Sequence, residues 1–370
     1  MRRLLFIVNV DWFFLSHRLP LAIAAKEAGF EVHLAAAVTD RVQEIERHGI
    51  KVHPLNIDRR SANPMEAAKL LFDLFSLIRR VSPSVVHLVT IKPVLLGGLA
   101  ARLARVPRVV AAISGLGFVF TARGGVARLR RLLVSSLYRL ALSRNNVRVI
   151  FQNGDDQALL QRHTGIADAQ VVRIRGSGVD LSAWTVQPLA DGPPVVMMAS
   201  RLLKDKGVVE FVEAARMLHG HRLARFVLVG SVDAGNPTSL RVEDLDAWVK
   251  EGAIEWWGQS SDMPAVLSMA HIVVLPSYRE GLPKGLIEAA ASGRAVVTTD
   301  VPGCRDAIEP GVSGVLVEVR NPQALADGIR GLLGDPERIK AMGAAGRRLA
   351  EQSFDVREVI ARHLALYEGR

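Results

Sequence analysis

Two glutamates bracket a short segment in the second half of the chain. Glu280 and Glu288 span residues 280–288, which follow an apolar run at 272–275. The run is typical of a buried strand and Pro283 suits the first turn of a helix, so the pattern predicts a strand-to-helix corner. Backbone N–H groups at a helix start attract phosphate, whereas carboxylates accept hydrogen bonds from hydroxyl groups. A ligand that combines phosphate and sugar would use both. Alternatively, both glutamates are solvated residues near a helix N-terminus, where acids are common.

Two cations are predicted at the same edge of the sheet. Arg201 and Lys206 follow the apolar run at 195–199 and precede a helical pattern at 208–218. Both would project from the carboxyl ends of parallel strands, beside Glu280. Arginine grips a phosphate with two hydrogen bonds and lysine supplies a point charge, so the pair suits a diphosphate. A solvated basic loop is the alternative, and the convergence with residues 280–288 argues against it.

The elements that position these residues alternate between strands and helices along the whole chain. Apolar runs predict strands at 4–10, 31–36, 52–55, 85–90, 108–113, 147–152 and 170–174, and then at 195–199, 226–229, 254–257, 272–275, 295–299 and 315–317. Helical patterns lie between many of them, which predicts an α/β chain of two doubly wound Rossmann-like domains facing a cleft. We place the domains at 1–178 and 195–352, a linker at 179–194, and a C-terminal helix at 353–370 that packs back on the first domain.

Composition limits the class of protein. The chain has 370 residues, 49% of them hydrophobic, which suits two well-filled cores. Apolar residues at 4–8 imitate a signal peptide, but Asp11, His17 and Arg18 interrupt the run, so we expect a strand followed by a loop at 11–18. Cys304 is the sole cysteine, which excludes an internal disulfide and suits a reducing cytoplasm. We interpret it as an ordinary small residue and not as a nucleophile.

Basic residues are concentrated in the first half of the chain. Residues 74–154 contain 13 Lys and Arg residues and no acid. Such a surface attracts phosphates or an anionic membrane. Within it, leucines recur at helical spacing at positions 129, 132, 133, 137 and 140, and arginines lie between them. Two interpretations stay open for this helix: it lies on a membrane, or it faces the core with a basic outer side.

Together these motifs resemble the retaining glycosyltransferases of family 4, which have the GT-B fold. The resemblance covers essentially the whole chain and rests on the Glu280–Glu288 spacing and the Arg201–Lys206 pair. It implies that Arg201 and Lys206 hold the donor diphosphate, Glu280 lies beside the donor sugar, and Glu288 bonds the ribose hydroxyls. Amides around Gly281, Leu282 and Lys284 would approach the sugar and the diphosphate.

Motifs in the first half are similar to those of bacterial enzymes that extend sugars on a polyprenyl diphosphate carrier. They lie at 11–18, 90–93 and 114–118. The resemblance implies an acceptor side at Lys92, Ser114, Gly115 and Gly117. The chain lacks the glycine pair that many members carry after the first strand, and Ser114 stands where many have a histidine. His17 is then the candidate histidine of the cleft, and a packed or helix-capping histidine is the alternative.

The family's chemistry implies transfer with retention of configuration, without a metal or other cofactor. The co-substrate would be a UDP-sugar, with UDP-N-acetylhexosamine as the first trial, and the acceptor a lipid-linked saccharide at the inner face of the cell membrane. Three alternatives compete. The first is a sugar-nucleotide epimerase of the same fold. The second is a basic nucleic-acid-binding module, which the scarcity of aromatic residues in the basic segment disfavours. The third is a dinucleotide-dependent oxidoreductase, which is disfavoured because no Gly-x-Gly-x-x-Gly turn follows the first strand.

Overall fold

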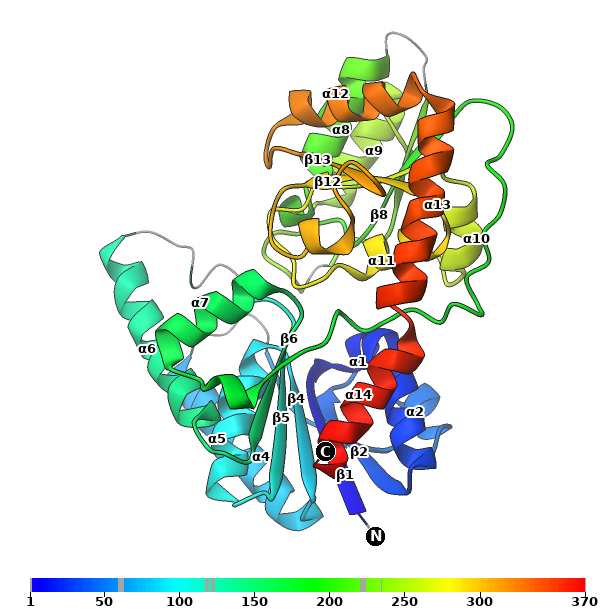
Figure 1. The fold of residues 1–370 in the computed structure, drawn as a ribbon. Coiled ribbons are helices and arrows are strands. Elements are labelled where there is room, and N and C mark those ends of the chain that lie inside the picture. Colours follow the sequence, from blue (N-terminus) through cyan, green and yellow to red (C-terminus); the bar gives the residue numbers. More distant parts are fainter. Residues whose placement is uncertain are drawn as a thin grey trace. The chain divides into compact units, whose positions relative to one another are not determined.

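The computed structural model divides the chain into two units. It describes residues 2–58, 63–116, 120, 124–219, 224–233 and 235–369. The first unit comprises Met1–Ser177 together with Arg357–Arg370, and the second comprises Gly178–Val356. Each unit is a parallel sheet with helices on both faces (Figure 1). The prediction of two doubly wound α/β units is confirmed.

The sheet of the first unit has the order β3-β2-β1-β4-β5-β6-β7, and all neighbouring strands are parallel. Its strands are β1 (Arg2–Val10), β2 (Phe30–Ala37), β3 (Lys51–Pro54), β4 (Val85–Val89), β5 (Arg108–Ile113), β6 (Val147–Phe151) and β7 (Val171–Arg173). The strand order reverses between β1 and β4. Ligands of such sheets bind at the carboxyl ends of the strands beside this reversal.

Alternation along β1 builds the core on both faces of that sheet. Leu5 and Ile7 belong to one apolar cluster, whereas Leu4 and Phe6 belong to another, because successive side chains of a strand point to opposite faces. Helices α4, α5 and α6 supply the first cluster, and α1, α2 and α14 the second. The helical segments are α1 (Asp11–His17), α2 (Leu19–Glu27), α3 (Val42–Glu46), α4 (Pro64–Val81), η1 (Pro93–Gly97), α5 (Gly98–Leu103), α6 (Gly125–Leu142), α7 (Gly154–Thr164), η3 (Asp168–Gln170) and α14 (Val356–Glu368). In the described parts of the chain, no helix is long and apolar enough to cross a membrane.

The second unit repeats the arrangement with the order β10-β9-β8-β11-β12-β13. Its strands are β8 (Val195–Ala199), β9 (Arg225–Val229), β10 (Glu255–Trp256), β11 (Ile272–Leu275), β12 (Ala295–Thr299) and β13 (Gly314–Val317). Its helical segments are η4 (Lys204–Lys206), α8 (Val208–His219), α9 (Val242–Glu251), α10 (Met263–Ser268), α11 (Lys284–Ala291), η5 (Arg305–Ala307), α12 (Pro322–Leu333) and α13 (Pro336–Ser353). Here the order reverses between β8 and β11, so the loops after these two strands lie next to each other.

The expectation of a loop at 11–18 is wrong, because Asp11–His17 forms helix α1. The segment contains neither glycine nor proline to break a helix, and Asp11 stands in its first turn, where an acid is favourable. The Asp11 carboxylate is fully buried and accepts hydrogen bonds from the backbone N–H groups of Trp12, at 2.7 Å, and of Thr39, at 2.6 Å. It therefore ties the start of α1 to the loop after β2.

The last helix of the chain belongs to the first unit. In α14, Val359, Leu366 and Tyr367 are buried in the same cluster as Leu4 and Phe6 of β1. The segment at 179–194 belongs to the second unit, where Val179 pairs with the backbone at 354–356 and Trp184 is buried in the core. The structural boundary between the two units therefore lies at Ser177/Gly178 and again at Val356/Arg357.

Candidate active site

The turn after β8 places Lys206 against the end of β11. Gly207 makes this placement possible, since its φ is +78° and a Cβ there would lie 2.1 Å from the backbone oxygen of Pro276. No other residue type fits such a close approach in the left-handed region. The backbone N–H of Tyr278 donates to the Asp205 oxygen at 2.9 Å. The two loops at the reversal of strand order are thus in contact and joined by a backbone hydrogen bond.

Lys206 and Glu280 form an ion pair at this junction. Their side chains are 19% and 12% exposed, so the pair is mostly shielded from water. The Ser277 hydroxyl donates to the same carboxylate oxygen, Oε1 of Glu280, at 2.6 Å. Ser277 is itself buried. The structure therefore brings together two of the residues predicted from the sequence and fixes the direction of the Glu280 carboxylate.

The loop after β12 contacts the backbone of the corner at 280–281. The N–H of Glu280 donates to the Pro302 oxygen at 3.2 Å. Gly303 has a φ of +80°, and a Cβ there would lie 2.6 Å from the backbone oxygens of both Glu280 and Gly281. Close packing of this kind requires glycine. The corner at 280–281 is consequently held in position by the loop that follows β12.

Arg201 is paired with a carboxylate that the sequence analysis did not single out. Its Nη1 donates to Oδ2 of Asp233 at 2.9 Å, and Asp233 follows β9, the neighbour of β8. The Arg201 side chain is 41% exposed. Asp233 could have been found from the sequence as an acid beyond a predicted strand, at the edge that already carries the predicted cations.

Glu288 lies within α11 and is mostly buried. Lys284, one turn earlier, pairs with it at 3.3 Å between Nζ and Oε1. Burial raises the pKa of the Glu288 carboxyl above its ordinary value, and the charge of Lys284 partly opposes this rise. α11 begins after Pro283, which occupies the N-cap position without a side-chain cap, and Leu282 is buried beside it. The expected helix start at Pro283 is therefore correct to within one residue.

The predicted residues of the first unit lie at the carboxyl ends of β1, β4 and β5. Lys92 follows β4 and donates to the backbone oxygen of Asp58. Burial lowers the pKa of Lys92. Ser114 and Gly115 follow β5, and the Ser114 hydroxyl is buried. Gly117 lies outside the described residues. Because β1, β4 and β5 are consecutive in the sheet, these positions share one edge.

His17 is the last residue of α1 and packs against an aromatic ring. Its imidazole stacks on Phe13 with ring centroids 4.1 Å apart and planes 5° apart. The side-chain contacts of His17 therefore favour the interpretation of a packed histidine.

Cys304 lies in the loop after β12 and is buried. Burial raises the pKa of its thiol to about 12, and the charge of Glu280 adds to the rise. A thiol with this pKa is not a nucleophile at neutral pH. Across the described ranges, no group of three or more His, Cys, Asp or Glu side chains is placed to hold a metal ion. Metal independence stays a prediction.

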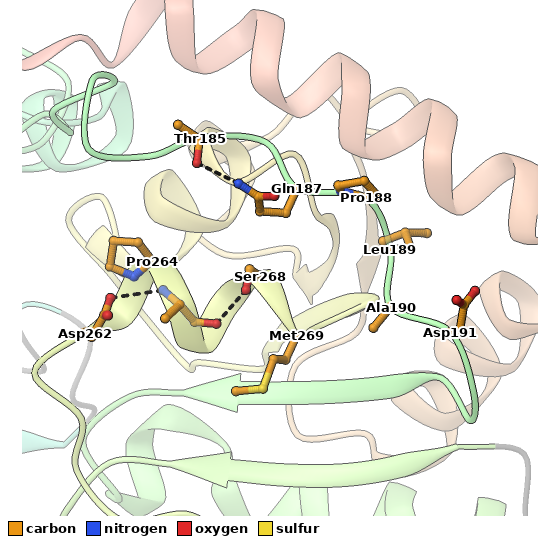
Figure 2. A pocket seen from close by; sticks show the side chains of 11 residues that line it. Thr185, Gln187, Pro188, Leu189, Ala190, Asp191, Asp262, Pro264, Ser268 and Met269 are labelled. Carbon is orange, nitrogen blue, oxygen red and sulfur yellow. Dashed lines mark hydrogen bonds between the residues drawn. The ribbon is translucent and has the colours of Figure 1, made fainter.

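A separate hollow of about 700 Å³ lies between the segment at 185–191 and helix α10 (Figure 2). Asp262 caps α10 by accepting from the Ala265 N–H at 3.1 Å, and the Ser268 hydroxyl donates to the Ala265 oxygen at 2.6 Å. None of the residues predicted for the site lines this hollow. We therefore assign the candidate site to the loops after β8, β9 and β11.

Comparisons with known proteins identify the family of the chain. A family model described as group 1 glycosyl transferases matches residues 185–349, and one described as glycosyl transferase 4-like matches residues 3–153. The N,N'-diacetylbacillosaminyl-diphospho-undecaprenol alpha-1,3-N-acetylgalactosaminyltransferase of Campylobacter jejuni is 31% identical over 377 residues, covering 96% of this chain and 97% of the relative. The UDP-Gal:alpha-D-GlcNAc-diphosphoundecaprenol alpha-1,3-galactosyltransferase of Escherichia coli is 25% identical and covers 71% of this chain and 69% of the relative.

A solved structure of the same architecture is similar along its whole length. Sucrose-phosphate synthase of Thermosynechococcus elongatus superposes with a TM-score of 0.80 at 20% identity, covering 100% of this chain and 99% of that one. The similarity shows that the fold is GT-B. The chain belongs to the group 1 glycosyltransferase family.

Proposed function

We propose that this glycosyltransferase moves a hexose or N-acetylhexosamine from a UDP-sugar to a saccharide carried on polyprenyl diphosphate, with retention of configuration. The observation that carries the proposal is the junction of Lys206 and Glu280 at the reversal of strand order, with Arg201 on the same loop. Cations for a diphosphate and a carboxylate for sugar hydroxyls meet there. The relatives named above act on diphosphoundecaprenol-linked substrates, which supports the acceptor class.

Each residue of the junction has a proposed role. Arg201 and Lys206 neutralise the diphosphate as the bond between it and the anomeric carbon breaks, and the acceptor hydroxyl attacks from the same face. Glu280, held by Ser277, accepts hydrogen bonds from the donor sugar. The acceptor proton passes to the departing phosphate oxygen. No metal is required, since the two cations and the start of α11 supply the positive charge.

Glu288 and the residues between the two glutamates complete the donor site. Glu288 accepts from the ribose hydroxyls, and the backbone at Gly281, Leu282 and Lys284 approaches the sugar and diphosphate. UDP is the proposed nucleotide because the E. coli relative is a galactosyltransferase that uses UDP-galactose. N-acetylhexosamine is the first sugar to test, because the relative at 31% identity is an N-acetylgalactosaminyltransferase.

Location follows from the acceptor. A polyprenyl diphosphate is anchored in a bilayer, so we propose that the enzyme works at the inner face of the cell membrane and associates with it peripherally. The acid-free stretch at 74–154 provides the positive charge for this association.

The test is transfer from a panel of UDP-sugars to a lipid-linked acceptor, with the anomeric configuration of the product read by NMR. Glu280→Gln and Arg201→Ala should each abolish transfer while the protein stays folded. Arg216→Ala is the control, because it removes a comparable ion pair with Glu251 on the solvated surface of the same unit. Transfer retained in either site variant would refute the assignment. Interconversion of UDP-sugar isomers without acceptor would identify an epimerase instead.

A further inference from the structure

Helix α6 carries leucines on the side that faces away from the core of its unit. Leu129, Leu132, Leu133 and Leu140 have exposed fractions of 71, 59, 62 and 48%. Among the side chains of this helix that the structure describes, the buried ones are Ser135, Tyr138, Ala141 and Leu142. Of the five leucines whose spacing was singled out in the sequence, Leu137 alone packs partly against the core. The core-facing interpretation of the leucine spacing is therefore wrong for four of the five.

The exposed leucines lie on one face of the helix, with the exposed Ser136 between Leu133 and Leu140. At about 100° of rotation per residue, all four fall within a sector roughly 100° wide, with Tyr138 on the opposite side of the helix. From Leu129 to Leu140 the stripe extends about 16 Å along the axis at a rise of roughly 1.5 Å per residue. α6 thus has two apolar faces, one within the unit and one without a partner in it. We call the outer one the leucine stripe.

Arginines border the leucine stripe on both sides. By the same rotation, Arg128 and Arg139 lie along one edge and Arg130 along the other. All three side chains are exposed. The helix belongs to the acid-free stretch at 74–154, so its own sequence offers these cations no carboxylate. Apolar side chains edged by cations match a surface that is apolar inside and anionic at its boundary.

The exposed apolar residues of helix α4 lack this setting. Phe72 and Met65 of α4 are exposed by 68% and 79%, but the half-buried Asp73 and the exposed Glu66 stand next to them. Carboxylates there would be repelled by anionic headgroups. The combination of exposed leucines with a basic border on a helix that contains no acid therefore distinguishes α6 from α4.

We propose that the leucine stripe of α6 docks onto an anionic lipid bilayer. The leucines enter the boundary between headgroups and acyl chains, and Arg128, Arg130 and Arg139 bind lipid phosphates, as in helices that lie in the plane of an interface. The proposal deepens the membrane association within the proposed function and rests on it for its biological purpose. It places the first unit at the surface where a lipid-linked acceptor is embedded.

Vesicle binding tests the proposal directly. The full chain is sedimented with phosphatidylglycerol-containing vesicles and with neutral phosphatidylcholine vesicles. We expect stronger binding to the anionic vesicles, weakened by salt, because salt screens exposed charges. The double variant Leu129→Ser/Leu133→Ser should bind at least about tenfold less, since two apolar side chains lose their burial. Val312→Ser is the matched control, because Val312 is 53% exposed in the second unit. Leucine variants that bind like the unmodified protein would overturn the proposal.

A fluorescent label reports insertion independently of affinity. Cys304 is buried and is the sole cysteine, so Leu133→Cys provides a single accessible thiol for an environment-sensitive dye. With anionic vesicles we expect a blue shift and protection from an aqueous quencher, and with Val312→Cys neither. An unshifted label at 133 would overturn the proposal. A shift that instead follows protein concentration without vesicles would identify a second copy of the chain as the occupant.

Transfer assays separate this proposal from the proposed function. With a short-chain, water-soluble acceptor, the double leucine variant should turn over like the unmodified enzyme. With a long-chain acceptor in vesicles, its rate should fall in parallel with its vesicle binding. If the unmodified protein transfers to neither acceptor but still binds anionic vesicles through α6, the proposed function fails and the docking surface stands.

Discussion

Replacing Glu288 by glutamine should stabilise the free protein and weaken its binding of UDP. The Glu288 side chain is mostly buried and burial raises its pKa, so the folded state disfavours the charged form of this carboxyl group. Glutamine keeps the shape and removes that charge. Stabilising changes at functional sites of this kind amount to about 1 kcal/mol. For a unit of this size, about 1 kcal/mol corresponds to roughly 2–4 °C in Tm.

The same substitution weakens the proposed contacts to ribose. Two charge-assisted hydrogen bonds become neutral ones, at a cost of about 1 kcal/mol each. The dissociation constant for UDP should therefore rise roughly thirtyfold. At a UDP concentration about 100 times the original dissociation constant, stabilisation by UDP should fall from about 2.7 to about 0.9 kcal/mol. Thermal unfolding with and without UDP measures both effects in one experiment.

The pH dependence supplies a check on the sign. The folded pKa of Glu288 is raised, so its favourable contribution is present below the ordinary carboxyl pKa of 4.5 and is lost as the pH rises through the folded pKa. The gain from Glu288→Gln should consequently vanish below about pH 4.5. Glu337→Gln is the control, because Glu337 pairs with Lys340 on a helix of the same unit but is 82% exposed. A variant that is less stable than the original at pH 7, or that keeps its full response to UDP, would refute the reasoning.

Three further predictions concern the supports of the site and of the first unit. Ser277→Ala removes the 2.6 Å hydrogen bond to Glu280 and should lower kcat about tenfold with little change in KM for the donor; an unchanged kcat would contradict this. Gly303→Ala should lower the unfolding free energy by at least about 2 kcal/mol, because a Cβ there would meet the backbone oxygens at 280 and 281. Gly311 has a φ of +78° and open space around it, so Gly311→Ala should lower the unfolding free energy by only about 1 kcal/mol. Urea unfolding of both variants measures the difference. Burial lowers the pKa of His363 to about 3, so its contribution to stability is complete above the ordinary pKa of 6.5 and is lost as the pH falls toward 3. His363→Leu should therefore make the unfolding free energy fall less steeply between pH 6.5 and pH 3. An unfolding free energy that falls as steeply in the variant as in the original protein would contradict this.

The residues that meet at the candidate site were predictable from the sequence because parallel sheets obey a simple rule. Apolar runs at 195–199 and 272–275 indicated strands, and loops that follow such strands gather at one edge. This was enough to expect Lys206 near Glu280, which the structure confirms. Arg201 was placed at the same edge. Its partner Asp233 was not predicted, because strand order is a long-range property and nothing local identifies β9 as the neighbour of β8.

Helix α1 shows where local patterns were insufficient. Residues 12–15 are four consecutive apolar or aromatic residues, which lack the spacing of a single helical face, and the polar residues on either side favour a loop. What holds the helix is the buried Asp11 carboxylate, whose hydrogen-bond donors come from Trp12 and from Thr39, 28 residues away. A contact at that separation has no signal in a window of ten residues.

Helix α6 shows a different limit, since its leucine spacing was detected correctly and still did not decide the direction of the leucines. Periodicity fixes which residues share a face but not which face meets the core. In the structure the core side is made by Tyr138, Ala141 and Leu142, so packing of the unit does not account for Leu129 or Leu133. Exposed apolar stripes bring a liability to aggregation, and they are expected where a partner covers them. The basic border of the stripe then selects an anionic partner, which is the physical reason to connect α6 with the bilayer that holds the proposed acceptor.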